Sequence, residues 1–206
     1  MPATPPTSPL ASVRGAAAPP VRQRVFDHER IWRLEPEAFA AAARLLAEHE
    51  RPHRPTVVVA IARGGVPLGQ ALGRLLGVPV VTITLRHNHD DGLKVEATGC
   101  VDIVECAGLQ QVASGSRVLV ADDICGTGAT LDVLAPLLRQ HLRPAGVRTV
   151  VLCRNAASCD LQEGAGPDAW VFDTRDWVVF PWNDPAGAAT EPLTAPAGVR
   201  TRQRAC

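Results

Sequence analysis

Hydrophobic and polar residues follow two different patterns through the middle of the chain. Short runs rich in Val, Ile and Leu, bounded by polar residues or glycine, are typical of buried strands, whereas apolar residues spaced three or four apart indicate amphipathic helices. Strands are predicted at 56–62, 78–85, 117–121 and 147–153, with shorter apolar stretches at 169–173 and 177–180. Helices are predicted at 37–50, 66–76 and 130–142.

This alternation of strands and helices predicts an α/β fold, in which a mostly parallel twisted sheet is flanked by helices. In such sheets, ligands bind at the carboxyl ends of the strands. The two ends of the chain have a different composition. Residues 1–21 and 185–206 are rich in Pro and Ala, so we expect a disordered arm and a flexible tail around a folded domain at 22–184.

Composition and charge narrow the range of partners. The chain has 206 residues, and its 21 Lys and Arg balance its 21 Asp and Glu, which argues against a broad nucleic-acid-binding face. No apolar run approaches the ~18 residues of a membrane helix, and the N-terminus lacks a secretory signal, so we expect a cytoplasmic protein without membrane or nucleic-acid partners. The six cysteines include no C-x-x-C pair, and we expect neither disulfides nor structural zinc, although His49 and His53 have a spacing found in zinc sites.

The segment 118–131, VLVADDICGTGATL, carries the strongest chemical signal. A hydrophobic strand delivers Asp122 and Asp123 at its carboxyl end, and small residues then open a helix. Backbone N–H groups of such a turn, the helix N-terminus and the hydroxyls of Thr127 and Thr130 can hold a phosphate, while the carboxylates accept hydrogen bonds from vicinal hydroxyls. The alternative is a tight turn that happens to carry two acids, but carboxylates at a buried strand end need a ligand or cation. The pattern therefore favours a phosphorylated sugar as ligand.

This segment resembles the phosphoribosyl pyrophosphate (PRPP) motif of type I phosphoribosyltransferases, and the resemblance covers about 56–183. It implies the type I fold with a flexible hood loop, a homodimer or homotetramer, and transfer of the phosphoribosyl group from PRPP to a ring nitrogen with release of pyrophosphate. Asp122 and Asp123 would be catalytic, hold the ribose and bind Mg²⁺. The 5-phosphate would bind a phosphate loop made of Gly126, Thr127, Gly128, Ala129 and Thr130.

Two further segments fit the resemblance. Residues 62–65, Ala-Arg-Gly-Gly, lie where the family keeps a short loop for the diphosphate, hereafter the diphosphate loop. Its glycines, Gly64 and Gly65, would let the diphosphate approach the backbone closely, and the Arg63 guanidinium can bind the diphosphate. The resemblance makes Arg63 a catalytic candidate. The family also often has a non-proline cis peptide that precedes or involves Arg63. The polar segment 87–102 corresponds to the hood, and there Lys94, the chain's only lysine, is a catalytic candidate, with a solvated polar loop as the alternative.

The base-binding residues come from a third likeness. The run from Trp177 to Asn183, WVVFPWN, is similar to the tryptophan-rich ending of 6-oxopurine phosphoribosyltransferases. The similarity implies that Trp177 stacks on the base, that Val178 reads it through its main chain, and that Arg154 replaces a base-reading lysine. For Trp182, a packing role is the preferred interpretation.

One departure from the 6-oxopurine pattern concerns the phosphate loop. Gly126 stands where those enzymes carry an acidic residue that serves the base N7, and a glycine there leaves space for a substituted base. A 6-oxopurine or a close analogue remains the leading acceptor. The alternatives are a specialised-metabolism enzyme acting on a modified base such as a 7-deazapurine or another small acceptor, and a non-catalytic PRPP-sensing regulator.

Overall fold

The computed structural model describes residues 24–86, 102–105, 107–159, 166–184, 187–194 and 198–202. A seven-stranded sheet in the order β10-β7-β6-β5-β2-β3-β4 forms its centre. The inner strands run parallel and are β2 (Val57–Ala62), β3 (Val80–Arg86), β5 (Arg117–Cys125), β6 (Gly146–Asn155) and β7 (Ala169–Thr174). The edge strands β4 (Asp102–Glu105) and β10 (Arg200–Thr201) are antiparallel to their neighbours.

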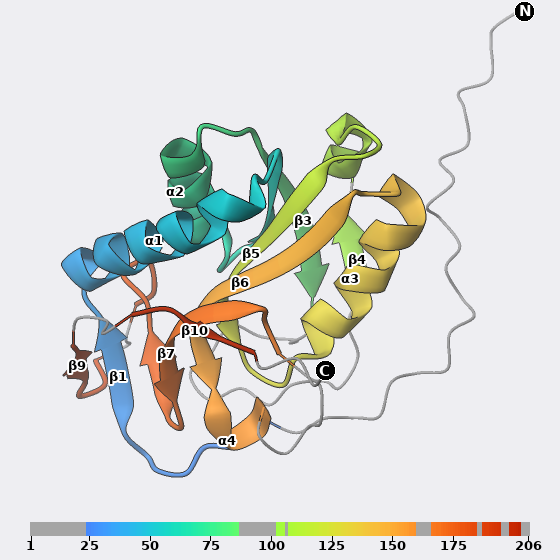
Figure 1. Cartoon of the computed structure of the whole chain (residues 1–206). Helices are drawn as coiled ribbons and strands as arrows, with labels where there is room; N and C mark the ends of the chain where they lie inside the picture. Colours follow the sequence, from blue (N-terminus) through green and yellow to red (C-terminus); the bar gives the residue numbers. More distant parts are fainter. Residues whose placement is uncertain are drawn as a thin grey trace, which may run out of the picture.

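Helices cover both faces of this sheet (Figure 1). On one face lie α1 (Pro36–Glu50) and α2 (Val66–Leu76), and on the other lies α3 (Ala129–Leu142). Successive residues of β2 alternate between two hydrophobic cores, because side chains of a strand point to opposite faces: Val58 packs with α1 and α2, whereas Val57 and Val59 pack with α3. Three short helical segments lie between these elements: η1 (Arg51–His53), η2 (Ala107–Gln111) and α4 (Ala156–Cys159).

A second, small sheet lies beside the first. Its strands are parallel and follow the order β8-β1-β9, with β1 at Ile31–Leu34, β8 at Trp177–Val179 and β9 at Glu191–Leu193. Ile31 pairs in register with Trp177. This pairing joins the segment before α1 to the tryptophan-rich end of the domain.

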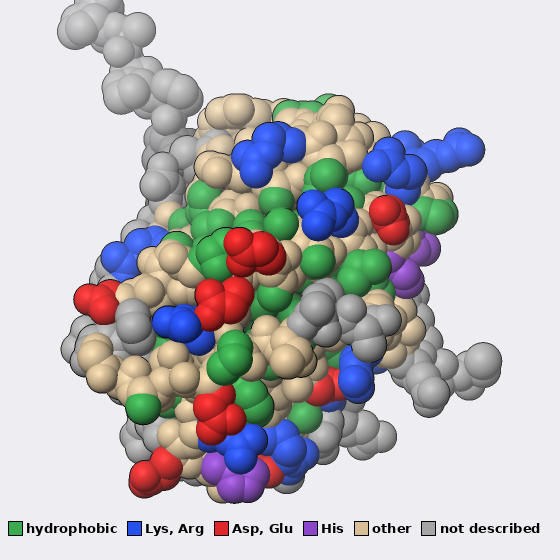
Figure 2. All heavy atoms as spheres, turned by 90° about the vertical axis from the view of Figure 1, so that its left-hand side faces the viewer, with side chains coloured by type: hydrophobic (Ala, Val, Ile, Leu, Met, Phe, Trp, Pro, Cys, Tyr) green, Lys and Arg blue, Asp and Glu red, His purple; other side chains and the backbone are tan. Residues whose placement is uncertain are grey.

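The predicted α/β fold is confirmed, with the predicted helices and main strands present to within a few residues. The sequence patterns did not predict β1, β4, β9 or β10, and the last two lie inside the 185–206 segment for which we expected a flexible tail. Among the residues that the structure describes, no helix is long and apolar enough to cross a bilayer. On the face drawn in Figure 2, acidic and basic side chains are interspersed with hydrophobic ones.

Candidate functional site

The diphosphate loop and the two acids meet where β2 and β5 end. A Cβ atom added to Gly64 would lie 2.1 Å from Oδ2 of Asp123, and one added to Gly65 would lie 2.7 Å from Cα of Asp122. Any side chain at either glycine would therefore displace the acid pair. The structure thus brings together two motifs that are about sixty residues apart in the sequence. The peptide bond between Ala62 and Arg63 is cis, which confirms that prediction.

The two acids occupy an environment that opposes their ionisation. Burial raises the pKa of Asp122 well above its usual range, and the negative charge of Asp123 raises it further. Burial also raises the pKa of Asp123, to about 6, although backbone N–H donation to its carboxylate and the charge of Arg24 oppose the shift. The Ile124 N–H donates to Oδ1 of Asp123 at 2.7 Å, and the Asp123 N–H donates to Oδ1 of Asp122 at 2.9 Å. A cation, or hydroxyl groups that donate hydrogen bonds, would stabilise the ionised carboxylates of this pair.

The phosphate loop leads directly from β5 into α3. Gly128 precedes the helix with a φ of 82°, a left-handed conformation that glycine adopts without strain. Thr127 is buried, and its Oγ1 accepts a hydrogen bond from the Ala129 N–H at 3.4 Å. The first N–H groups of a helix have no partner within the helix, and they carry its positive dipole end. These N–H groups lie next to Asp122 and Asp123, and the binding of an anion by this loop stays a prediction.

The segment before β1 packs against Trp177. The Phe26 ring lies 5.4 Å from the Trp177 ring at an interplanar angle of 56°. The Arg24 guanidinium lies 5.8 Å from the same ring. In Figure 1 this blue segment runs along the lower end of the molecule, past α4. Val178 is buried and pairs with Trp32 of β1, as a residue of the edge strand β8.

The space that we expected beside Gly126 is filled. A Cβ atom added to Gly126 would lie 3.1 Å from Nε and 3.6 Å from Nη2 of Arg24. The expectation was wrong because it considered only the residue in the loop, whereas the side chain that occupies this position comes from a segment about a hundred residues earlier. The Arg24 guanidinium therefore lies against the glycine that replaces the acid of the 6-oxopurine pattern.

Other predicted base-site residues have clear packing partners. Arg154 Nη1 forms an ion pair with Asp173 Oδ1 at 3.2 Å, and its guanidinium lies 5.1 Å from the Trp170 ring. Its role as a base donor stays a prediction. Trp182 stacks on Phe180 with ring centroids 5.2 Å apart, in keeping with the packing role that we preferred. Lys94 and most of the expected hood lie outside the described residues.

The thiol of Cys125, just before the phosphate loop, is buried 3.6 Å from that of Cys159. The hydrogen bond with Cys159 and burial both raise the pKa of Cys125. A protonated, buried thiol is a poor nucleophile, so Cys125 serves as a small filler.

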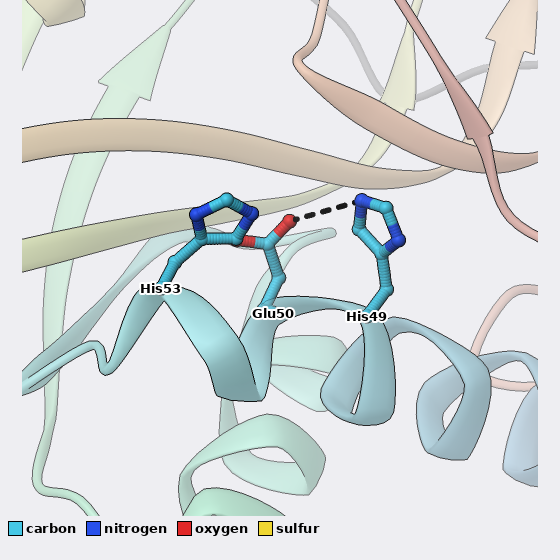
Figure 3. A group of neighbouring side chains, drawn as sticks. All are labelled: His49, Glu50 and His53. Atoms are coloured by element: carbon cyan, nitrogen blue, oxygen red, sulfur yellow. Dashed lines mark ion pairs between the residues drawn. The ribbon is translucent and has the colours of Figure 1, made fainter.

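A cluster of His49, Glu50 and His53 at the end of α1 resembles a metal-binding group (Figure 3). Glu50 is fully buried, and Arg148 donates to its two carboxylate oxygens at 2.6 and 2.8 Å. Because Arg148 already compensates this carboxylate, the geometry is that of a buried ion pair which fastens α1 to β6. It lies near the start of β6, whereas the paired acids lie at the carboxyl end of β5.

Comparison with known proteins supports the sequence resemblance. Residues 34–185 match the phosphoribosyl transferase domain family. An adenine phosphoribosyltransferase of Blochmanniella floridana is 27% identical over 111 residues, which are 51% of this chain and 58% of that protein. One of Rhodospirillum centenum is 31% identical over 112 residues, which are 50% of this chain and 61% of that protein. The match thus spans about three fifths of the curated relatives.

A solved structure shows the same architecture. The purine phosphoribosyltransferase of Pyrococcus horikoshii Ot3 superimposes with a TM-score of 0.60 and 26% identity, over 75% of this chain and 95% of that one. The likeness therefore extends well beyond the phosphate loop, to three quarters of the chain.

Proposed function

The chain belongs to the phosphoribosyltransferase family, and on that premise we propose that it transfers the 5-phosphoribosyl group of PRPP to a ring nitrogen of a purine-like base. The contact of the diphosphate loop with the acid pair carries the proposal. Gly64 lies so close to Asp123 that a ligand held by the two carboxylates also reaches the diphosphate loop. PRPP has ribose hydroxyls, a diphosphate and a 5-phosphate in the matching relative positions.

Each loop has a separate task in this proposal. Asp122 and Asp123 accept hydrogen bonds from the ribose hydroxyls, and Arg63 with the glycines of its loop holds the diphosphate. Residues 126–130 bind the 5-phosphate through N–H groups and hydroxyls. The bond from the anomeric carbon to the diphosphate oxygen breaks, and its electron pair leaves with the diphosphate. The ring nitrogen bonds to that carbon with inversion, and its proton passes to water. Donors fixed around the leaving group stabilise the charge that develops.

Mg²⁺ enters with PRPP as part of the substrate in this proposal. Magnesium prefers carboxylate, phosphate and water oxygens, and Asp122 and Asp123 are adjacent carboxylates whose pKa values burial raises, so that a cation beside them would favour their ionised forms. The two residues therefore fit the ion. It would supply positive charge to the departing diphosphate.

The base is proposed to stack on Trp177, with main-chain contacts from Val178 and a donor from Arg154. A purine is the proposed class, because the curated relatives are named for adenine and the ending from Trp177 to Asn183 is similar to that of 6-oxopurine enzymes. Modified bases with a bulky group facing Gly126 are disfavoured, since Arg24 occupies that position.

Calorimetry and a pyrophosphate-release assay test the proposal together. The wild-type protein should bind Mg²⁺–PRPP and release pyrophosphate with at least one of adenine, hypoxanthine, guanine or xanthine. Asp122→Asn combined with Asp123→Asn should abolish PRPP binding with the fold retained by circular dichroism. Undiminished PRPP affinity in that double variant would overturn the assignment of the acids. PRPP binding with no turnover on an extended panel of bases would replace the enzyme by a PRPP-sensing regulator.

A further inference from the structure

Residues 24–28, here called the N-terminal strap, are held firmly against the carboxyl end of the sheet. The Val25 N–H donates to Ser158 Oγ at 2.8 Å, and Asn155 Nδ2 donates to the Val25 carbonyl at 3.0 Å. The Asp27 N–H donates to the Arg175 carbonyl at 2.9 Å. Anchors on both sides of the strap indicate a built part of the site rather than a loose arm.

These anchors place the Arg24 side chain among three parts of the proposed active site. Its Nε lies 3.1 Å from a Cβ placed on Gly126 of the phosphate loop, and its guanidinium lies 5.8 Å from the Trp177 ring. Its charge interacts with that of Asp123. Within the described part of the chain, the buried Nε atom has no hydrogen-bond partner. A buried donor without a partner is costly, so a ligand that accepts from it is favoured.

The chemistry of the guanidinium limits what that ligand can be. The guanidinium lies over the Trp177 ring. In the proposed pose, a flat base contacts that ring and directs its attacking nitrogen at the ribose held by Asp123, so that one of its edges would face Arg24. A guanidinium donates hydrogen bonds and accepts none. The edge of the base that faces Arg24 must therefore carry a lone pair or a negative charge, and an N–H group there would be rejected.

We propose that Arg24 is a specificity-determining residue, which selects a base presenting an unprotonated or anionic azole ring nitrogen at the edge facing Gly126. This inference rests on the proposed function. Loss of the ring N–H proton spreads negative charge over both nitrogens of a five-membered ring. A guanidinium beside one nitrogen stabilises that anion, while the other nitrogen attacks. A carboxylate at position 126 would have the reverse preference, for a ring nitrogen that keeps its proton.

Two base analogues of almost equal shape separate this role from simple packing. In an 8-azapurine, nitrogen replaces a carbon of the five-membered ring and makes the ring N–H more acidic. In a 7-deazapurine, a C–H group replaces the accepting nitrogen. Both analogues are used in the 6-oxo and the 6-amino series, so that the choice between these exocyclic groups does not decide the result.

The variants are chosen to change only the group facing the base. Arg24→Met removes the charge and the donors, and Arg24→Lys keeps the charge without the planar fork. Arg30→Met is the matched control, because Arg30 lies a few residues away and 5.1 Å from another tryptophan ring, that of Trp32. Calorimetry measures the affinity of each base in the presence of Mg²⁺ and diphosphate, and separately the affinity of Mg²⁺–PRPP.

In the wild type and in Arg30→Met, the 8-azapurine should bind about 10- to 100-fold more tightly than the 7-deazapurine, as expected for a charge-assisted hydrogen bond. In Arg24→Met this ratio should fall at least tenfold, to a value near that set by the rings alone, and Arg24→Lys should be intermediate. Mg²⁺–PRPP affinity should change little.

Several results would overturn the inference. These are an unchanged ratio in Arg24→Met, no base binding by a wild type that binds PRPP, or a loss of PRPP affinity as large as the loss of base affinity. The last result would mean that Arg24 holds a phosphate group of PRPP. Failure of the wild type to bind Mg²⁺–PRPP would instead refute the proposed function itself, so the two failures are distinguishable.

Discussion

The two sides of the site are built in different ways. On the phosphate side, the diphosphate loop, the acids and the phosphate loop each come from one continuous stretch at the end of a strand. On the proposed base side, Trp177 meets Arg24 and Phe26, which come from the other end of the chain, and Arg24 also reaches Gly126 at the edge of the phosphate loop. Anion binding can be encoded locally by backbone N–H groups, whereas recognition of a base is assembled from distant segments. PRPP affinity should therefore depend on the close backbone packing of the phosphate side, and base affinity should depend on the N-terminal strap.

The largest loss of affinity should come from Gly64→Ala, which tests the close packing of the diphosphate loop against the acids. The added Cβ would lie 2.1 Å from Oδ2 of Asp123, so the carboxylate must move. Overpacking of this kind costs about 1–3 kcal/mol, and a misplaced acid loses its ligand as well, so PRPP affinity should fall at least ~100-fold. Calorimetry measures this loss.

Gly146→Ala is the matched control for that variant. An added Cβ at Gly146 meets nothing within 4 Å, so the same substitution should leave PRPP affinity unchanged. Equal affinities for the Gly64 and Gly146 variants would show that the diphosphate loop does not act with the acids.

The next prediction is that the stability of the folded protein depends on pH through the two acids of the phosphate side. Burial raises the pKa of Asp123 from 3.8 to about 6, and burial raises that of Asp122 well above its usual range. Where the folded state holds protons that the unfolded state has released, stability falls as pH rises. The ligand-free protein should therefore lose about 1–3 kcal/mol of unfolding free energy as the pH rises from about 4 through about 6.

Denaturant unfolding at a series of pH values measures how the free energy of unfolding changes with pH, which is the slope predicted here. Asp122→Asn should flatten it, because the amide cannot ionise and no longer repels Asp123. Asp132→Asn, at an exposed acid in the first turn of α3, serves as the control for the removal of one carboxylate from the protein. Stability that rises over this range in the ligand-free wild type would contradict the buried-pair interpretation.

These sites also differ in how far the sequence could predict them. The paired acids and the phosphate loop were predictable, because Asp122, Asp123 and the turn that follows form one segment between a strand and a helix. Arg24 was not predictable, since it is one arginine in a polar stretch, and its position depends on contacts with β6, α4 and the β7–β8 turn. The strands β1 and β9 have four and three residues, too few for a periodic pattern.

A smaller loss of base affinity should follow when the N-terminal strap loses one of the hydrogen bonds that hold it. Ser158 Oγ accepts from the Val25 N–H at 2.8 Å and donates to the Val25 carbonyl at 3.2 Å. Ser158→Ala leaves the N–H without this partner, whereas the carbonyl keeps its bond from Asn155 Nδ2. Loss of one such bond costs about 0.5–1.5 kcal/mol, so base affinity should fall about 2- to 10-fold, with PRPP affinity unchanged.

Thr56→Ala is the control for the loss of a hydroxyl that accepts from the backbone. Thr56 Oγ1 accepts from the Arg117 N–H at 2.9 Å, at the end of the sheet away from the site. This variant should lose stability but keep its base affinity. A loss of PRPP affinity in Ser158→Ala as large as its loss of base affinity would remove the distinction between the two sides.

The smallest effect is expected at Cys125, which lies on the boundary between the two sides. Its buried thiol is 3.6 Å from that of Cys159, and both the hydrogen bond with Cys159 and burial raise its pKa, so it should stay protonated at neutral pH. Cys125→Ala should change PRPP and base affinity by less than about threefold, since the side chain is buried against Cys159. Mass spectrometry after treatment with a thiol reagent should show modification of Cys125 only upon unfolding, and rapid modification of the native protein with loss of PRPP binding would instead make the thiol pair a redox-responsive element of the phosphate loop.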